Sequence, residues 1–350
     1  MKKRLRFSGM LLFAMVASFT FTACSDDDGG GVTTSKTPSP TLTDKSGNTI
    51  QLNKAGDNYF NYNNEGKLVS FGNYYEYEIE GDEFTIKNEE SYGGEEAYAT
   101  YNIELNSLGF ISKVNYKGAV EYDGDDEGYG GYNEYWEGTA TYNYNSNGEL
   151  IGINATEKEN GRDYDWEEDK YYNFSASYNV SQKFTWVNGD LISSEYKSKA
   201  NDGSIFEVYN DINYSNDLNP IKQNTLCFAY IQEFDLTSIL SLIGLLGVGT
   251  THLPTRLDYS DIEKEGDYED KYDGYKNCSY SLNNNGTIKI ENGRSYSYGN
   301  NINYSPGKTR DITDKQKNAG IINRNRNNSA SCTDNKRITL KISEIREMVI

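Results

Sequence analysis

The chain has 350 residues and a formal net charge of −19 at pH 7, and only 36% of its residues are hydrophobic. It holds 31 tyrosines and 33 glycines but a single histidine. A nucleic-acid-binding protein needs a basic face that displaces counterions, so this charge excludes that class. The lone histidine argues against a histidine-rich metal site and against a histidine-centred triad, and the abundance of aromatic residues favours strands over helices.

Residues 1–23 have the layout of a secretory signal peptide, with a basic start and an apolar run that ends in small residues. The segment Phe21-Thr22-Ala23-Cys24 resembles a bacterial lipobox, in which the signal is removed before a cysteine that becomes lipidated, although that pattern prefers leucine at Phe21. Residues 25–31 resemble the acidic export tag of Bacteroidota lipoproteins. We therefore expect a lipid anchor on Cys24, a flexible tether over residues 24–46, and a location at the outer membrane facing the extracellular side.

Three further cysteines, Cys227, Cys278 and Cys332, follow without the CxxC spacing of a metal site. A disulfide between Cys227 and Cys278 is compatible with an oxidising compartment. The sequence favours the alternative, in which each cysteine is an isolated small apolar side chain in the core.

A short pattern, apolar-Asn-x-x-Gly-x-(Leu/Ile), recurs through the tyrosine-rich part of the chain. Its four full copies are Tyr62–Leu68, Leu105–Ile111, Tyr144–Leu150 and Leu282–Ile288, with a shortened copy at Trp186–Leu191 and a degraded one at Tyr214–Pro220. Asn and Gly favour tight turns and apolar residues resume on the far side, so each copy predicts a β-hairpin. The flanking runs alternate apolar and polar residues, which predicts antiparallel strands with one buried face.

These hairpins predict an all-β domain over residues 47–304, built as a long antiparallel up-and-down meander that curls into a barrel or half-barrel. The aliphatic run 234–248 interrupts the pattern, and its spacing predicts one short apolar helix near 235–247 that plugs an open end of the sheet. A lid over a hydrophobic ligand and a lip that touches lipid are alternatives. His252 is expected in the return loop. Residues 305–350 contain no tyrosine and predict a basic, mostly disordered tail.

The Tyr-Asn-x-x-Gly-(Lys/Glu)-Leu copies resemble the core of YD repeats. From about residue 48 to residue 304, the chain is more similar to a lipoprotein domain family of unknown function from gut Bacteroidota, described as having a porin-like fold. That resemblance implies a barrel-like sheet and brings no catalytic residues. One face of the strands is mainly Tyr and Ala and the other carries Glu and Asn, without the apolar band of membrane-spanning strands, so we expect a body that dissolves in water.

Acidic clusters are the candidate cation sites of the sequence. The cluster Asp123, Asp125, Asp126 and Glu127 is a weak calcium candidate, because its oxygen ligands lie close together but lack the EF-hand spacing. In so acidic a chain such clusters are more often solvated loops. Nucleophile, HExxH and phosphate-loop motifs are absent from the sequence, and its many carboxylate pairs are uninformative about glycoside hydrolysis. We expect neither an enzyme nor a cofactor.

Trp136 and Trp166 lie beside acidic loops, and exposed indole rings stack on sugars or bury against protein partners. Packing of these rings into the sheet is the alternative. The sequence thus predicts a surface-exposed binding or adhesion lipoprotein with a glycan or protein ligand, held to the membrane by the lipid on Cys24. The alternative function is an envelope lipoprotein that holds a hydrophobic ligand in the curled sheet, closed by the insertion at 234–248.

Overall fold

The computed structural model of the chain describes residues 36–72, 76–80, 83–92, 95–124, 130–165, 170–231, 235–266 and 268–299. The predicted signal peptide, Cys24 and the predicted tail over 305–350 lie outside these residues.

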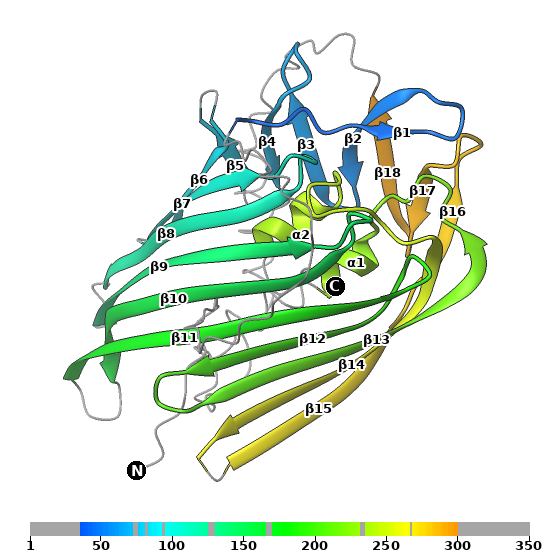
Figure 1. Cartoon of the computed structure of the whole chain (residues 1–350). Coiled ribbons are helices and arrows are strands. Elements are labelled where there is room, and N and C mark those ends of the chain that lie inside the picture. The colour runs from blue at the N-terminus through cyan, green and yellow to red at the C-terminus, as the bar shows by residue number, and fades with distance from the viewer. Residues whose placement is uncertain are drawn as a thin grey trace, which may run out of the picture. The chain divides into compact units, whose positions relative to one another are not determined.

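The described residues form a single antiparallel sheet of 18 strands with two short helices (Figure 1). The strands that precede the helices are β1 (Leu42–Thr43), β2 (Thr49–Ala55), β3 (Asn58–Tyr62), β4 (Leu68–Gly72), β5 (Glu76–Ile79), β6 (Thr85–Tyr92), β7 (Glu95–Leu105), β8 (Ile111–Gly124), β9 (Gly130–Tyr144), β10 (Leu150–Asp165), β11 (Lys170–Val187), β12 (Asp190–Ala200) and β13 (Ile205–Leu218). The helices α1 (Leu226–Tyr230) and α2 (Asp235–Ser241) follow, and then β14 (His252–Glu265), β15 (Tyr268–Asn277), β16 (Tyr280–Leu282), β17 (Ile288–Glu291) and β18 (Arg294–Gly299).

The strand order confirms the predicted meander. Backbone ladders join each strand to the next from β2 to β15, and a second run from β16 through β18 returns to β2. β15 and β16 follow each other along the chain, and within the described residues no register joins them side by side. The sheet is therefore curled but not closed, and Figure 1 shows it curving around α1 and α2.

Burial along the strands follows the predicted period of two. On β7, Ala99, Tyr101, Ile103 and Leu105 are buried, whereas Tyr98, directly before them, is 46% exposed. Several buried tyrosines have hydrogen-bonded hydroxyl groups. Tyr62 Oη donates to the Leu52 carbonyl at 2.9 Å, and Tyr296 Oη donates to Glu291. An apolar ring with a satisfied polar tip can be buried at little cost, which explains how a chain with few aliphatic residues builds this core.

The four full copies of the turn pattern all form the predicted hairpins. In the first copy, Asn63 Oδ1 accepts hydrogen bonds from the backbone N–H groups of Glu65 at 2.9 Å and Lys67 at 3.0 Å. Gly66 then adopts a φ of 76°, which glycine reaches without a steric penalty. The shortened copy is a two-residue hairpin turn in which Asn188 and Gly189 have φ values of 55° and 83°.

The degraded copy does not form a hairpin. Its first residues, Tyr214 to Leu218, continue β13 up to its end, and the chain then leaves the sheet toward α1. This segment contains no glycine to take the positive φ that the other copies use, which is the physical reason for the difference.

A fifth turn of the same type lies in the segment that the sequence assigns to the tether. Asp44 Oδ1 accepts from the backbone N–H groups of Ser46 at 2.8 Å and Asn48 at 2.9 Å, and Gly47 has a φ of 84°. This turn joins β1 to β2. Upstream of it, the Pro38 carbonyl accepts a bond from Leu68 N at 3.1 Å. Residues 36–46 therefore belong to the folded body, whose boundary lies earlier than the expected residue 47.

The aliphatic insertion is helical only in its first half. α2 ends at Ser241, because Gly244 and Gly247 adopt φ values of 82° and 88° and turn the chain. The second half is tied to the sheet by backbone bonds from Ile111 N to the Leu245 carbonyl at 2.8 Å and from Val248 N to the Gly148 carbonyl at 3.0 Å. The insertion thus packs against two hairpin ends of the sheet. No helix in the described ranges is long and apolar enough to cross a bilayer.

Candidate functional site

Every second residue of β10 faces the inner side of the sheet. The first of these residues are apolar, and the next two are glutamates. Ile153 and Ala155 are buried on this side, and Glu157 and Glu159 follow them with only 5% and 9% of their surface exposed. This side faces the helices, because Tyr142, which is paired with Ile153, hydrogen-bonds to Thr237 of α2. Burying a carboxyl group costs free energy unless it is hydrogen-bonded or neutral, so these two glutamates are candidates for function.

Aromatic residues of the neighbouring strands surround the two glutamates. Tyr178 of β11 is paired with Glu157, and Trp136 of β9 is paired with Glu159. Tyr116 Oη of β8 donates a hydrogen bond to Glu157 Oε2 at 3.0 Å, and Tyr178 hydrogen-bonds to Glu159. We call Tyr116, Trp136, Glu157, Glu159 and Tyr178 the carboxylate–aromatic cluster.

Burial raises the pKa of both glutamates in the cluster. The hydrogen bond from Tyr116 lowers the pKa of Glu157 in part, while the charges of Glu159 and Glu134 raise it further. Burial likewise raises the pKa of Glu159, against the hydrogen bond with Tyr178. A carboxyl group that holds its proton can donate one hydrogen bond and accept others, as a sugar hydroxyl also does.

Trp136, one of the two predicted stacking residues, lies in this cluster. Its half-buried ring rests on Gly118, the paired residue of β8, where an added Cβ would come within 2.3 Å of Trp136 Cζ2. The indole Nε1 is buried and has no hydrogen-bond partner among the described residues. By contrast, Trp186 Nε1 donates to the Leu150 carbonyl at 2.7 Å. One donor in the cluster thus lacks the acceptor that a buried N–H group normally has.

The flat position of the Trp136 ring belongs to a repeated arrangement. An aromatic residue stands directly opposite a glycine in three further cross-strand pairs: Tyr116 with Gly138, Phe174 with Gly161, and Tyr259 with Gly274. In each pair a Cβ on the glycine would lie within 3 Å of the ring atoms. The glycines therefore make room for rings that lie down on the sheet.

Most of the other predicted site residues lie outside the part of the chain that the structure describes. Cys24, Trp166, Asp125, Asp126 and Glu127 lie outside the described residues, and Asp123 is placed only as a residue of β8 near its end. Within the described part of the chain, no group of three or more His, Cys, Asp or Glu side chains is arranged to hold a metal ion.

His252 opens β14 instead of lying in the return loop. Its Nδ1 lies 2.7 Å from Asp190 Oδ2, and its backbone N–H donates to Asp190 Oδ1 at 2.8 Å. The histidine thus fixes the start of β14 against the start of β12.

Sequence reasoning missed Glu157, Glu159, Tyr116 and Tyr178 as site residues. A signal for the glutamates was present, because the alternation that begins at Ile153 places both on the apolar side of the strand. The two tyrosines become neighbours of the glutamates only through the strand register, which cannot be read from the sequence pattern.

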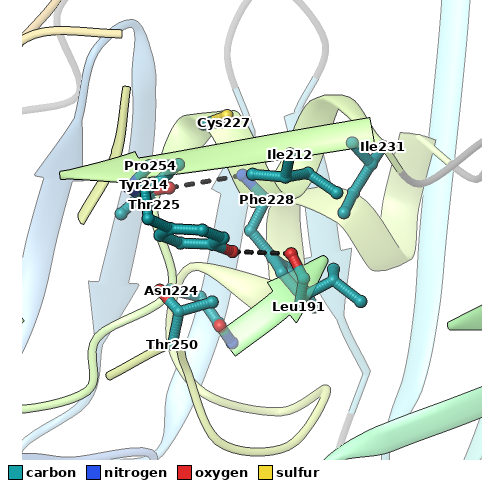
Figure 2. Close-up of a pocket in the computed structure, with 10 residues that line it drawn as sticks. All are labelled: Leu191, Ile212, Tyr214, Asn224, Thr225, Cys227, Phe228, Ile231, Thr250 and Pro254. Atoms are coloured by element: carbon teal, nitrogen blue, oxygen red, sulfur yellow. Dashed lines mark hydrogen bonds between the residues drawn. The ribbon is translucent and has the colours of Figure 1, made fainter. Parts of the chain in front are cut away.

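A cavity lies between α1, β12 and β13, close to the insertion (Figure 2). Its apolar lining includes Leu191, Ile212, Phe228 and Ile231, and Figure 2 shows Tyr214 Oη donating to the Leu191 carbonyl at 2.7 Å. The cavity has a volume of about 10 Å³. That volume is at the lower limit for a single water molecule, so the insertion leaves no room here for a hydrophobic ligand.

No protein-family model matches the sequence, and no curated protein matches it either. Among solved structures, the chain is similar to a porin-like protein from Bacteroides vulgatus ATCC 8482, with 16% identity, a TM-score of 0.34, and 71% of this chain and 92% of that chain covered. It is also similar to a porin-like protein from Bacteroides uniformis ATCC 8492, with 16% identity, a TM-score of 0.26, and 61% of this chain and 97% of that chain covered. Neither the lipoprotein family that the sequence resembles nor the YD repeat is confirmed.

Proposed function

We propose that this chain is a lipid-anchored outer-membrane protein on the extracellular side that binds a glycan through the carboxylate–aromatic cluster and performs no catalysis. The observation that carries the proposal is the buried indole N–H of Trp136, which lacks an acceptor within the described residues and lies on the strand position paired with Glu159. The lipobox-like segment that ends at Cys24 supports the anchor.

The chemistry of the cluster suits a sugar. A sugar ring presents C–H groups on its faces, which pack on an indole or a phenol ring, and hydroxyl groups at its edge that both donate and accept hydrogen bonds. Trp136 and Tyr178 supply the rings and are half-buried, so a ligand can reach them. Glu157 and Glu159 supply carboxyl oxygens beside those rings, and Trp136 Nε1 supplies a donor.

The proposal does not include hydrolysis. Glycoside hydrolysis needs two carboxyl groups that are free to act on the bond that is cut. In the cluster, each carboxyl group is already hydrogen-bonded by a tyrosine, Glu157 by Tyr116 and Glu159 by Tyr178. The small cavity beside the insertion also favours the glycan over the alternative of an enclosed hydrophobic ligand.

A panel of soluble polysaccharides tests the proposal by affinity gel electrophoresis of the purified protein. We expect retardation by at least one polysaccharide, and about tenfold or more weaker binding in Trp136→Ala. Trp136→Phe keeps a ring but loses the N–H group, so we expect an intermediate affinity. The matched control is Tyr209→Ala, because Tyr209 is 40% exposed between buried neighbours and so faces outward.

Equal retardation of the parent and Trp136→Ala would place the ligand elsewhere, and failure of every polysaccharide would leave a protein ligand as the better proposal. The anchor is tested separately with Cys24→Ala. We expect this variant to lose partitioning into detergent, whereas unchanged partitioning would exclude the lipid on Cys24.

A further inference from the structure

Two cysteines far apart in the sequence meet at the start of α1. Cys227 is the second residue of that helix and is buried, and Cys278 follows the last residue of β15 and is half-buried. Their side chains lie within hydrogen-bonding contact of each other, and both are free thiols in this structure.

The buried carboxyl group of Glu291 accepts hydrogen bonds from residues on both sides of this contact. Glu291 has no exposed surface and accepts hydrogen bonds from Leu226 N at 2.8 Å and Cys227 N at 2.9 Å. Tyr280, two residues beyond Cys278, donates to the same carboxyl group at 3.2 Å. Cys278 N itself donates to the Thr255 carbonyl at 2.8 Å. The two thiols are thus held together by elements that do not depend on a bond between them.

The two thiols differ in access and in acidity. The hydrogen bond from the Cys227 thiol lowers the pKa of Cys278, in opposition to its partial burial. The same hydrogen bond, followed by burial, raises the pKa of Cys227. Thiolates are the nucleophiles in disulfide exchange, so Cys278 is both the more reachable and the more reactive of the two.

We propose that Cys227 and Cys278 form a redox-active pair, in which Cys278 is attacked first by a disulfide oxidant and Cys227 then closes an intramolecular disulfide. The oxidant is a low-molecular-weight or protein disulfide, for which oxidised glutathione serves as the probe. This proposal is independent of any glycan ligand.

The reaction balances with that oxidant. The thiolate of Cys278 attacks one sulfur of glutathione disulfide, forms a mixed disulfide and expels one glutathione thiolate. Cys227 then loses its proton and its sulfur attacks Sγ of Cys278, which forms the Cys227–Cys278 bond and expels the second glutathione thiolate. The protein loses two protons and two electrons, and glutathione disulfide is reduced to two glutathione thiols, which take up the protons.

The bond would join α1 to the end of β15 across the insertion and the β14–β15 hairpin. Because a disulfide that closes a long loop restricts the unfolded chain, we expect the oxidised protein to melt roughly 5–10 °C higher than the reduced protein. The short helix α1 would gain most, since five residues form little helix by themselves.

Peptide mass mapping tests the pair in the full-length protein, extracted without reductant and alkylated with iodoacetamide during denaturation. We expect Cys227 and Cys278 in one cross-linked peptide pair, lighter by about 2 Da than the sum of its thiol forms. If both residues carry the alkyl group, the protein is reduced, and oxidised glutathione is then added to the native protein. A protein that still forms no intramolecular bond excludes the pair.

Two single variants test the order of the steps, each in a full-length background that carries Cys24→Ala and Cys332→Ala so that no other thiol reacts. In Cys227→Ser we expect a stable glutathione adduct on Cys278. In Cys278→Ser we expect Cys227 to react about tenfold or more slowly, because its thiol is buried and less acidic. Equal rates in the two variants would overturn the proposed order, and the mass mapping of the parent remains decisive if either variant fails to fold.

Discussion

The pKa of Glu157 differs between the folded and the unfolded protein. Its carboxyl group is 5% exposed and accepts a hydrogen bond from Tyr116, yet burial and the neighbouring charges of Glu159 and Glu134 raise its pKa well above that of an ordinary glutamate. The folded state therefore binds the proton of Glu157 more tightly than the unfolded state does.

This difference predicts a pH dependence of stability with a definite sign. The contribution of Glu157 is fully present below the ordinary glutamate pKa, and it is lost as pH rises through the raised pKa of the folded state. Each such carboxyl group changes the free energy of unfolding by at most about 1.4 kcal/mol per pH unit in that window. Glu157→Gln cannot ionise, so we expect the variant to gain stability relative to the parent as pH rises above the ordinary glutamate pKa.

Denaturant titration of the parent and Glu157→Gln across that range measures the effect. Glu207 is the matched control, because Lys197 hydrogen-bonds to it and lowers its pKa. Glu207→Gln should therefore lose stability relative to the parent as pH rises from the acid range. A constant difference between parent and Glu157→Gln at all pH values would show that Glu157 titrates normally.

At the residue scale, the sequence predicted what depends on near neighbours. The Asn63, Asn106 and Asn145 turns form as expected, because their hydrogen bonds reach only four residues along the chain. The contact of Tyr116 with Glu157 joins residues 41 positions apart, and it exists only because of the register of β8, β9 and β10. A hydropathy pattern fixes which face a residue takes but not which residue stands opposite.

At the element scale, the glycines of β8–β11 that stand opposite aromatic rings leave the space in which those rings pack. A Cβ on Gly138 would lie 2.4 Å from the Thr156 carbonyl and 2.4 Å from Tyr116 Oη. The carbonyl belongs to the backbone of β10 and cannot move aside without disturbing the ladder. Gly152, by contrast, has only the Gln182 carbonyl nearby, at 3.3 Å from an added Cβ.

We therefore expect Gly138→Ala to destabilise the protein by about 1–3 kcal/mol, and Gly152→Ala to change its stability by less than about 1 kcal/mol. Chemical denaturation of both variants beside the parent measures the difference. Both glycines lie in strands, so replacing either with alanine changes the strand propensity in the same way. The difference between the two variants therefore reports the space available to the added Cβ. Equal losses in the two variants would mean that the Tyr116 ring is not held against Gly138.

The helix in the insertion shows where prediction from spacing stops at the element scale. Leu236, Leu240 and Ile243 are buried, as a helical row would require. However, the expected helix over 235–247 ignores Gly244, whose positive φ ends the helical turns early. Leu245 and Leu246 are buried all the same, because the backbone of the second half bonds to the hairpin ends of the sheet. Tertiary contacts replaced the helix there.

At the scale of the whole molecule, the body begins before the residue that composition suggests. Pro, Ser and Thr around residues 36–43 indicate a tether, but Thr37 Oγ1 donates to the Glu83 carbonyl at 3.1 Å and the buried side chain of Gln51 donates to the Pro40 carbonyl at 3.2 Å. Asn285, from the far end of the domain, donates to Asp44 at 3.3 Å. The segment therefore connects the first and last parts of the sheet.

A protein that starts at residue 47 should be less stable than one that starts at residue 36, by about 2 kcal/mol or more and roughly 5 °C in Tm. The shorter protein loses β1 and the carbonyl partners of buried polar groups such as Gln51. Differential scanning calorimetry of the two proteins measures the loss, and a protein that starts at residue 25 serves as the control for chain length. Identical Tm values for the proteins that start at residues 36 and 47 would show that residues 36–46 do not stabilise the body and belong to the tether.

The fold class was predictable because each hairpin has a turn pattern of adjacent residues and consecutive strands of the chain pair with each other. The curl of the sheet was not predictable, since it depends on how much each strand twists and on the pairing of β2 with β18 at Gln51, Leu52, Lys54 and Ala55. Composition placed the start of the body at residue 47, whereas specific hydrogen bonds tie residues 36–46 to the sheet despite their polar sequence.

The pairing of β2 with β18 has a consequence for the order in which the sheet folds. The turns at Asn63, Asn106 and Asn145 can close as soon as each hairpin is made, because their hydrogen bonds reach only four residues along the chain. β2 is synthesised early, yet its partner strand β18 follows it by more than two hundred residues. During synthesis β2 therefore waits with one edge unpaired, and non-local pairing of this kind is slow. The rate-limiting event of folding should be the arrival of β18, and agents that capture free strand edges should act on this protein before that event and not after it.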